Sequence, residues 1–577
     1  MTPRRVSAGT IAVVLLAGAM ATAAVVIGIS GHGQTLKSDE WGYAERASRP
    51  LGDALFEPPA RKYLLAVPML FYEGLFNTAG TDHYFPYQAL GIVLLLLSAG
   101  LFYALARRGL GDLWAIPPTI VILFLGSAWD VVVTPLRVPE LFSISAGLGM
   151  LLCLERRDLR GDLGAALLLL IGLTSHPSAL AFAVAAIAMV VLRPARERWR
   201  HSWTVLVPIG LYGSWWLFVR NPGPAAKPEL GNLPDIPKFC AQSFAGATST
   251  LTGVAGVVAR PGALSVQESL DSPLTWIVAV VFAGLLILAI LLRRRSGALS
   301  PMFWAVLSGL VALWVLTTLA PRQVEVRSAA SGRYLYPSVL LLLLLVAELA
   351  RGIRLSRAAP WLATGVLALG FVYNITELNY LAARLRTRSD QIRAYLGALE
   401  LARGRVAPTF LGDYTPNQRL TAATYFTVAG AFGTPAATPA GISRGSLDAA
   451  VVADHVLAQA LRLQLSSAGA VPPSGGTAPK IEGAVRARTE GACVRLLPTG
   501  GSLAAELVLP PGGAWLQSRR MPEVSVRIGR FGPAVYPLTS PPAGNSAALK
   551  IPRDRAPDPW SATVTARRAV TVCGLPR

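Results

Sequence analysis

Long apolar runs separated by short polar connections follow one another as far as residue 377. Most of these runs approach or reach the roughly 17–25 residues that carry a helix across the hydrocarbon core of a bilayer. Inside lipid every backbone polar group must be hydrogen-bonded internally, so such runs predict helices. About eleven spanning helices are expected, at residues 9–30, 86–106, 113–129, 139–154, 162–175, 177–192, 203–219, 274–292, 301–319, 334–350 and 359–377.

The pattern is weakest in the apolar tract that the segment "GLTSHPSAL" interrupts. Pro177 falls inside this segment, and a proline removes a helical hydrogen bond and bends or ends a helix. Two interpretations therefore stay open: two short spans that meet at Pro177, or one bent helix.

Clusters of arginine fall on alternate connections between the expected spans, at residues 4–5, 107–108, 156–160, 193–200, 293–295 and 351–357. The positive-inside rule places these connections in the cytoplasm. Because the number of spans is odd, the amino terminus is expected inside and the carboxyl terminus outside. The first run also resembles a signal peptide, but with further spans behind it an uncleaved anchor is favoured. The abundance of Ala, Arg and Pro suggests a bacterial plasma-membrane protein.

Three regions on the expected outer side are long enough to carry structure of their own. Residues 31–85 form a first outer loop, whose apolar stretches such as "YLLAVPMLFYEGLF" predict helices at the membrane surface. Residues 220–273 form a second outer loop, and the tail follows the last span. The chain is thus expected to divide into a transmembrane domain at 1–380 and an extracytoplasmic domain at 381–577.

The tail is rich in Gly, Pro, Ser and Thr and has no spanning run. The segment "RSDQIRAYLGALELARGR" predicts an amphipathic helix at its start. Later runs such as "SLAAELVL", "EVSVRIG" and "SATVTARRAVTV" predict an antiparallel sheet or β-sandwich. The expected fold is an α-helical polytopic membrane protein with an extracytoplasmic α/β domain that contains a β-sandwich-like part.

Two of the four cysteines, Cys493 and Cys573, lie near the edges of the expected β region. Outside the membrane a disulfide between them is chemically allowed and would hold the last strand in place. Two unpaired buried cysteines are the alternative. Trp515 and Trp560 in the same region are candidates for stacking on sugars, although packing in the core is the commoner fate of such residues.

Composition narrows the class of protein further. The chain is 53% hydrophobic and 15% charged, whereas soluble domains carry about a quarter charged residues. The cytoplasmic arginines account for much of the formal net charge of +21, so no nucleic-acid partner is implied. In the tail, basic residues outnumber acidic ones, which favours anionic glycans or lipid phosphates. No nucleotide-binding loop and no metal-ligand spacing is recognisable.

The segment "SDEWGYAERA" places three acids directly after the first span. Solvated loop charges are the simplest explanation of Asp39, Glu40 and Glu45. Their setting among Trp41 and Tyr43, in a loop expected to pack on the membrane surface, favours a held carboxylate instead. A carboxylate held in this way can act as a general base toward a hydroxyl.

These residues resemble the first-loop signature of the GT-C glycosyltransferases, in particular the branch of protein O-mannosyltransferases and aminoarabinose transferases. That branch reads Asp-Glu-x-x-Tyr-Ala-Glu and then a Glu-Lys-Pro-Pro-like turn. The matches to the first part are Asp39, Glu40, Tyr43, Ala44 and Glu45. In "FEPPARKYLL", Glu57 and the prolines after it match the turn, whose lysine is missing; Arg61 or Lys62 could substitute.

Later segments resemble the same family in the same order, and the resemblance covers residues 9–350. "PLRVPELF" offers Arg137 and Glu140 where the family usually has Arg and Asp, and in "GLTSHPSAL" His176 replaces a lysine. "SGRYLYPSV" resembles the Arg-Tyr-x-x-Pro element through Arg333 and Tyr334. Each element also has a structural explanation: an ion pair between Arg137 and Glu140, a loop-tip histidine, and an interfacial aromatic anchor.

The resemblance implies an inverting hexosyl- or pentosyltransferase with a polyprenyl-phosphate sugar as donor and a glycan, glycolipid or exported protein as acceptor. The position of the tail resembles the outer domains of actinobacterial cell-wall arabinofuranosyl- and mannosyltransferases, which are carbohydrate-binding domains in several relatives. In this interpretation Asp39 is the base, with Glu40 as its neighbour or alternate. The substrate-binding candidates are Tyr43, Glu57, Arg61, Lys62, Arg137, Glu140, His176, Arg333 and Tyr334. Some relatives use a divalent metal, and the first-loop acids could bind Mg²⁺ or Mn²⁺, although no cofactor is required.

Two other classes of function stay open. A transporter or flippase for lipid-linked sugars predicts internal repeats and charges near mid-span, and neither is clear in this sequence. A non-catalytic envelope assembly factor would use the outer domain to hold partners. The first-loop acids argue against an assembly factor, but only through the family resemblance.

Overall fold

The computed structural model describes residues 7–56, 63–219, 229–262, 265–320, 328–351, 358–415, 420–472, 474–482, 485–499, 501–539, 544–552 and 556–576. The chain forms two compact units. The first contains residues up to His32, Arg46–Ala79 and Tyr84–Leu385. The second contains Gly33–Glu45, Gly80–His83 and the chain from Arg386 onward.

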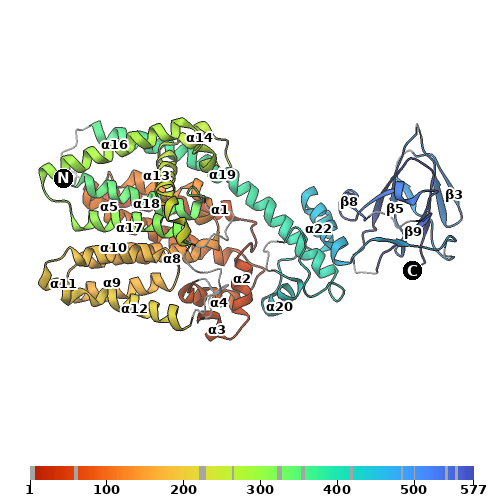
Figure 1. Cartoon of the computed structure of the whole chain (residues 1–577), viewed down its shortest axis with the longest axis horizontal. Coiled ribbons are helices and arrows are strands. Elements are labelled where there is room, and N and C mark those ends of the chain that lie inside the picture. Colours follow the sequence, from red (N-terminus) through yellow and green to blue (C-terminus); the bar gives the residue numbers. More distant parts are fainter. Residues whose placement is uncertain are drawn as a thin grey trace, which may run out of the picture. The chain divides into compact units, whose positions relative to one another are not determined.

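The first unit is helical. Its long helices are α1 (Ala8–Gly31), α5 (Phe85–Leu110), α8 (Val138–Glu155), α9 (Leu159–Leu173), α10 (Ala179–Val191), α12 (Trp203–Phe218), α13 (Ile236–Thr252), α16 (Pro273–Ser296), α17 (Pro301–Leu319), α18 (Gly332–Ala350) and the start of α19 (Ala358–Leu401). Its shorter elements are α3 (Leu51–Phe56), α4 (Ala66–Ala79), α6 (Ile116–Leu123), η2 (Gly126–Ala128), α7 (Trp129–Val132), η3 (Pro135–Arg137), α11 (Ala195–His201), η5 (Leu230–Asp235), α14 (Val254–Val258) and α15 (Ser265–Ser269). Helices α5, α8, α10, α17 and α18 lie side by side (Figure 1).

Seven helices among the described residues are long and apolar enough to cross a membrane. They are Ala8–Gly31, Phe85–Leu110, Pro135–Glu155, Pro273–Arg295, Pro301–Thr318, Gly332–Ala350 and Ala358–Leu401. The protein is therefore a multi-pass membrane protein. The other four expected runs also contain helices, but these are shorter, and Pro177 separates α9 from α10 as two elements.

The run expected as one span at 113–129 is interrupted in the structure. Helix α6 ends at Leu123, and the chain continues through η2 and α7. A side chain at Gly126 would meet the carbonyl oxygen of Asn374 at 1.8 Å, so α19 passes directly over this glycine. The amide oxygen of Asn374 accepts hydrogen bonds from the backbone N–H of Ser127 (3.0 Å) and from its hydroxyl (2.8 Å). A polar side chain from a distant helix thus satisfies the groups that the break exposes.

Two further expectations are wrong in detail. The last span and the amphipathic helix expected after it are one continuous helix, α19, of 44 residues. At about 1.5 Å per residue such a helix is roughly 66 Å long, far more than a bilayer core requires. The second outer loop is not a simple connection, because η5, α13, α14 and α15 form there and α13 packs against α16, α17 and α18.

The first outer loop is helical, as its apolar pattern predicts. It contains α2 (Glu40–Ala47), α3 and α4. On α4 the side chains of Pro68, Met69, Tyr72 and Phe76 are buried. Met69, Tyr72 and Phe76, three and four residues apart, lie on one face of the helix, which packs against α5 and α8.

The second unit joins helices to a β-sandwich. Its helices are the first residues of α2, the end of α19, α20 (Ala422–Phe432), α21 (Pro439–Ser443) and α22 (Leu447–Ala460). Its strands are β1 (Leu465–Ser467), β2 (Lys480–Glu482), β3 (Ala487–Glu490), β4 (Cys493–Leu496), β5 (Leu503–Val508), β6 (Gly513–Gln517), β7 (Ser525–Gly529), β8 (Tyr536–Pro537), β9 (Ser546–Lys550), β10 (Ser561–Ala566) and β11 (Val570–Gly574). A single turn of 3₁₀ helix, η6, covers Met521–Glu523.

The strands form two antiparallel sheets, in the orders β1-β9-β6-β11-β4-β3 and β2-β5-β10-β7-β8. Strand β5 alternates buried and exposed residues along most of its length, which is the pattern of a strand with one face in the core. The expected runs become β5, β7, β10 and β11, so the sequence predicted the sandwich correctly.

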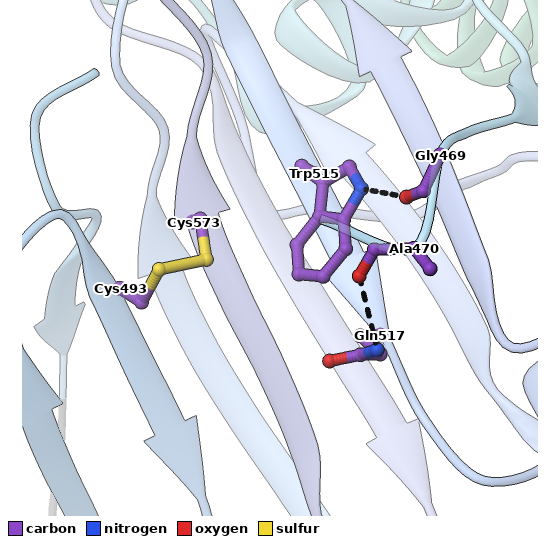
Figure 2. The surroundings of a disulfide bond; sticks show 6 residues. All are labelled: Gly469, Ala470, Cys493, Trp515, Gln517 and Cys573. Atoms are coloured by element: carbon purple, nitrogen blue, oxygen red, sulfur yellow. Dashed lines mark hydrogen bonds between the residues drawn. A yellow bond between two sulfur atoms is a disulfide. The ribbon is translucent and has the colours of Figure 1, made fainter. Parts of the chain in front are cut away.

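Cys493 and Cys573 form a disulfide, with an S–S distance of 2.06 Å (Figure 2). They are direct partners in the register of β4 and β11, so the bond joins neighbouring strands of one sheet. Trp515, on the strand at the other side of β11, is 2% exposed, and its indole N–H donates to the carbonyl of Gly469 at 3.0 Å. Trp560 is also buried. Both tryptophans are core residues, which corrects the expectation that they stack on sugars.

Candidate functional site

A polar cluster occupies the start of α8 in the first unit. Pro135 begins η3, and Pro139 lies at the first turn of α8, positions that proline tolerates because no helical partner is lost. The guanidinium Nε of Arg137 lies 3.4 Å from Asp130 Oδ2, and its Nη1 lies 3.6 Å from Glu140 Oε1. Glu140 is buried. The arginine therefore compensates two acids at the end of a spanning helix, where unpaired charges are costly.

His176 joins this cluster from the turn between α9 and α10. Its Nε2 lies 3.4 Å from Glu140 Oε1. Its Nδ1 accepts a hydrogen bond from the backbone N–H of Ser178 at 3.3 Å, so the proton of a neutral ring resides on Nε2 and points toward Glu140. Burial, together with the charges of Arg137 and Arg333, lowers the pKa of His176 to about 3. The imidazole is thus a neutral donor over the physiological range of pH.

Arg333, at the start of α18, contributes a second cation. Its charge acts on both Glu140 and His176. Its guanidinium carbon lies 4.7 Å from the centre of the Tyr334 ring, a cation–π contact that orients the side chain. Among the described residues its Nε is buried and has no hydrogen-bond partner. The cluster thus contains a cation with an unused donor.

The packing around Asp130 explains why a glycine precedes this arginine. A Cβ at Gly332 would meet Asp130 Oδ1 at 1.9 Å, so only glycine lets α18 approach the carboxylate this closely. Asp130 was not among the residues that the sequence pattern suggested for this cluster. The available signal was an acid inside the apolar stretch "GSAWDVVVTPL", since acids at membrane depth are rarely left unpaired.

The first outer loop approaches the same cluster from the other side. The ring of Tyr63 makes an edge contact with His176, with 5.5 Å between centroids. The hydroxyl of Tyr72 donates to the carbonyl of Pro135 at 2.7 Å, and the N–H of Val67 donates to the carbonyl of Thr174 at 3.4 Å. The candidates Glu57, Arg61 and Lys62 lie outside the described residues. The structure therefore brings Arg137, Glu140, His176 and Arg333 together.

The first-loop acids lie in the second unit and differ sharply from each other. Asp39 is exposed, whereas Glu40 is fully buried. Glu40 Oε2 accepts a hydrogen bond from the backbone N–H of Lys37 at 2.8 Å. Between them Ser38 has φ of +51°, in the left-handed region that non-glycine residues rarely adopt. Burial lowers the pKa of Lys37 to about 8, an effect that Glu40 opposes and Arg393 reinforces.

The surroundings of these acids are rigidly packed. The indole N–H of Trp41 donates to the carbonyl of Leu36 at 3.0 Å, and its ring meets Tyr425 of α20 edge-on at 5.9 Å. Tyr43, expected to bind substrate, is 5% exposed and belongs to the core. Glu45 is partly exposed. Asp39 is thus an accessible carboxylate on a well-held turn.

No group of three or more His, Cys, Asp or Glu side chains within the described ranges could hold a metal ion. The buried Glu40 carboxylate already accepts a backbone hydrogen bond beside Lys37. A metal on the first-loop acids would have to compete with that bond.

The fold and these polar groups define a multi-pass membrane protein with a β-sandwich after its spanning helices. No protein family matches the chain, and no curated protein matches it. Two solved structures of ArnT from Cupriavidus metallidurans are similar to it. One has undecaprenyl phosphate bound (15% identity, 74% of this chain and 85% of ArnT covered, TM-score 0.41). The other is in the apo state (16% identity, 74% and 90% covered, TM-score 0.42).

The arabinosyltransferase EmbB from Mycobacterium smegmatis is also similar, at 12% identity and a TM-score of 0.35. The match covers all of this chain and 65% of EmbB. All three TM-scores are low, so a function has to be supported by the residues of the chain itself.

Proposed function

We propose that the protein is a membrane glycosyltransferase of the GT-C type that takes its sugar from a polyprenyl-phosphate donor. The acceptor is a cell-envelope glycan, a glycolipid or an exported protein on the outer face of a bacterial plasma membrane. The sugar is a pentose or a hexose. Residues 1–380 carry the catalysis, and residues 381–577 form the extracytoplasmic domain.

The observation that carries the proposal is the unused donor of Arg333 at the end of a spanning helix. Leaving a buried donor unpaired costs roughly 1–3 kcal/mol, which a bound anion would recover. A guanidinium matches a phosphate because it donates paired hydrogen bonds in one plane. A polyprenyl phosphate offers its phosphate at this depth, where its lipid tail enters the bilayer. Arg137 adds positive charge nearby but is already paired with Asp130 and Glu140.

The neutral His176 supports this phosphate-binding role of the arginines. Its Nε2–H points toward Glu140 and holds that carboxylate beside Arg137. The three side chains form a framework that keeps the cationic groups in place. Tyr63 and Tyr72 connect this framework to the first outer loop.

Asp39 is proposed as the catalytic base. It is exposed, whereas its neighbour Glu40 is buried and hydrogen-bonded within the turn. In the reaction Asp39 takes the proton from an acceptor hydroxyl while the oxygen attacks the anomeric carbon. The bond between the anomeric carbon and the phosphate oxygen breaks, and polyprenyl phosphate leaves with its electron pair. Attack from the side opposite the leaving group inverts the configuration.

The experiment that tests this function measures product release. Purified full-length protein is incubated with a panel of polyprenyl-phosphate sugars and envelope glycan acceptors, and free polyprenyl phosphate is quantified. Acceptor-dependent release of polyprenyl phosphate supports a transferase. Movement of intact donor between the leaflets of a liposome, without release, would indicate a transporter and contradict the proposal.

A further inference from the structure

The outer face of the β3–β4 hairpin carries a group of arginines that the proposed reaction does not use. Arg488 on β3 and Arg495 on β4 are direct partners in the antiparallel register, and both are exposed. Arg486 precedes β3, and its carbonyl accepts a hydrogen bond from the backbone N–H of Leu497 at 2.9 Å. Residues two apart in a strand share a face, so all three arginines lie on one side of the hairpin.

These arginines border a shallow, open hollow of about 350 Å³, lined by Arg486, Ala487, Arg488, Arg495 and Leu497. Like charges placed directly opposite each other destabilise a strand pair. Within the described part of the chain none of the three arginines forms an ion pair that would offset this repulsion. An acid on the same face, Glu490, lies opposite Cys493 and not opposite an arginine. The hairpin therefore maintains a concentrated positive charge that a bound anion would neutralise.

The sheet continues this face with polar, uncharged side chains. Thr571 on β11 lies opposite Arg495, and Gln517 on β6 lies opposite Thr571. Four adjacent strands at about 4.8 Å spacing give a row roughly 14 Å long, from Arg488 to Gln517. Hydroxyl and amide groups beside guanidinium groups are the combination that can bind sugar hydroxyls next to a carboxylate or phosphate.

A row across the other sheet carries two acids and one arginine. There Glu482 on β2 and Glu506 on β5 are direct partners, followed by Thr563 on β10 and Arg527 on β7. Glu482, Glu506 and Arg527 are exposed. Of these two rows, the one on β3 and β4 is therefore the more basic and the better suited to an anion.

We propose that the outer face of β3–β4 binds an anionic glycan, a polysaccharide whose repeating carboxylate or phosphodiester groups enter the arginine hollow. Thr571 and the amide oxygen of Gln517 contact the hydroxyl groups of the adjoining sugar; the Nε2 of Gln517 donates to the carbonyl of Ala470 at 3.4 Å. A lipid surface fits less well, because peripheral helices and loops that bind membranes insert a broad apolar face, and the apolar side chains of this hollow are Ala487 and Leu497. The proposal does not depend on the transferase activity.

Binding is measured with full-length protein in nanodiscs of zwitterionic lipid. The probes are polygalacturonate, a glycerol-phosphate polymer and neutral dextran. We expect both anionic polymers, or one of them, to bind in a salt-sensitive manner and dextran not to bind. The double variant Arg488→Gln/Arg495→Gln should weaken that binding about tenfold or more, since charge-assisted hydrogen bonds are lost. The matched control is Arg527→Gln, an exposed strand arginine on the other sheet, which should bind as the wild type does.

Removing the facing like charges should leave the thermal midpoint of the double variant unchanged or raised, so a loss of binding will not reflect unfolding. Equal binding by wild type and double variant would overturn the proposal. Binding only to vesicles of anionic lipid, with no binding of either polymer, would assign the arginines to a membrane surface and overturn it as well. The binding measurement does not require turnover of a donor. A protein without transferase activity can therefore still bind the polymer, and a protein without the glycan site can still release polyprenyl phosphate.

Discussion

The carboxylate of Glu40 accepts a hydrogen bond from the backbone N–H of Lys37, and the N–H of Glu40 in turn donates to the carbonyl of Lys37. This reciprocal pair closes the turn at the start of α2 and holds Ser38 in its left-handed conformation. Asp39, the next residue, is exposed as a result. The two adjacent acids therefore differ in their surroundings: Glu40 holds the turn, and Asp39 is exposed.

Replacing Asp39 with Asn should lower the transfer rate by about 10²–10⁴-fold, because the amide keeps the shape of the side chain but cannot accept the proton. Glu40→Gln should keep most of the activity, since its amide oxygen can still accept from the N–H of Lys37. Glu45→Gln is a control within the same motif. Initial rates, donor binding and detergent-stable size are measured together. If Asp39→Asn binds donor and turns over near the wild-type rate while Glu40→Gln is inactive, the roles are reversed.

Arg333→Lys should weaken the binding of polyprenyl phosphate by about tenfold, because an ammonium group cannot donate the paired, planar hydrogen bonds of a guanidinium. The effect should appear in the dissociation constant of donor or product. Arg294→Gln is the control, an exposed arginine at the end of α16 that the positive-inside rule places in the cytoplasm. Unchanged affinity in Arg333→Lys would show that this residue is an interfacial anchor instead.

The low pKa of His176 predicts a pH dependence of stability. The unfolded chain binds a proton at this side chain below about pH 6.5 and the folded chain does not until about pH 3. Stability is therefore lost as the pH falls from 6.5 toward 3. At pH 4.5 the loss should be about 1–2 kcal/mol, after allowing for the partial exposure of the ring. His176→Gln keeps a donor toward Glu140. In this variant the thermal midpoint should depend less on pH between 4.5 and 7.5 than it does in the wild type. A variant as acid-sensitive as the wild type would refute the assignment.

The disulfide between Cys493 and Cys573 should be present in freshly purified protein, as peptides linked before reduction in mass spectrometry. The double variant Cys493→Ala/Cys573→Ala should lower the free energy of unfolding of the β domain by about 2–4 kcal/mol. Because the bond ties β4 to β11, amide exchange should increase first in the edge hairpin β3–β4. Two free thiols in unreduced protein would contradict this prediction.

The orientation of the chain can be tested by labelling in intact cells. In a background in which Cys153 and Cys240 are replaced with Ser, Ser525→Cys on the exposed face of β7 should react with an impermeant thiol reagent. Arg294→Cys should react only after the cells are permeabilised. The reverse pattern would place the β domain in the cytoplasm and remove the basis for an outer-face reaction.

Much of the architecture could be predicted from the sequence, because hydrophobic length and strand alternation are local properties. The helices at Ala8–Gly31 and Phe85–Leu110 lie where the apolar runs predicted them, and the alternating run "SLAAELVL" forms β5. The break after Leu123 could not be predicted in this way. It depends on Asn374 reaching Ser127 from another helix, a contact between residues 247 positions apart.

For the polar candidate residues, too, some features could be predicted from the sequence and others depended on tertiary contacts. The resemblance to the GT-C family suggested Arg137, Glu140, His176 and Arg333, which match or replace residues of its motifs. The packing of α18 against α7 decided that Asp130 joins them and that Arg333 keeps an unpaired Nε. For the adjacent acids Asp39 and Glu40, the sequence determined only that two carboxylates stand side by side after the first span. Which of them is buried was decided by the tertiary structure, because burial depends on the turn at Lys37 and on packing partners distant in the chain.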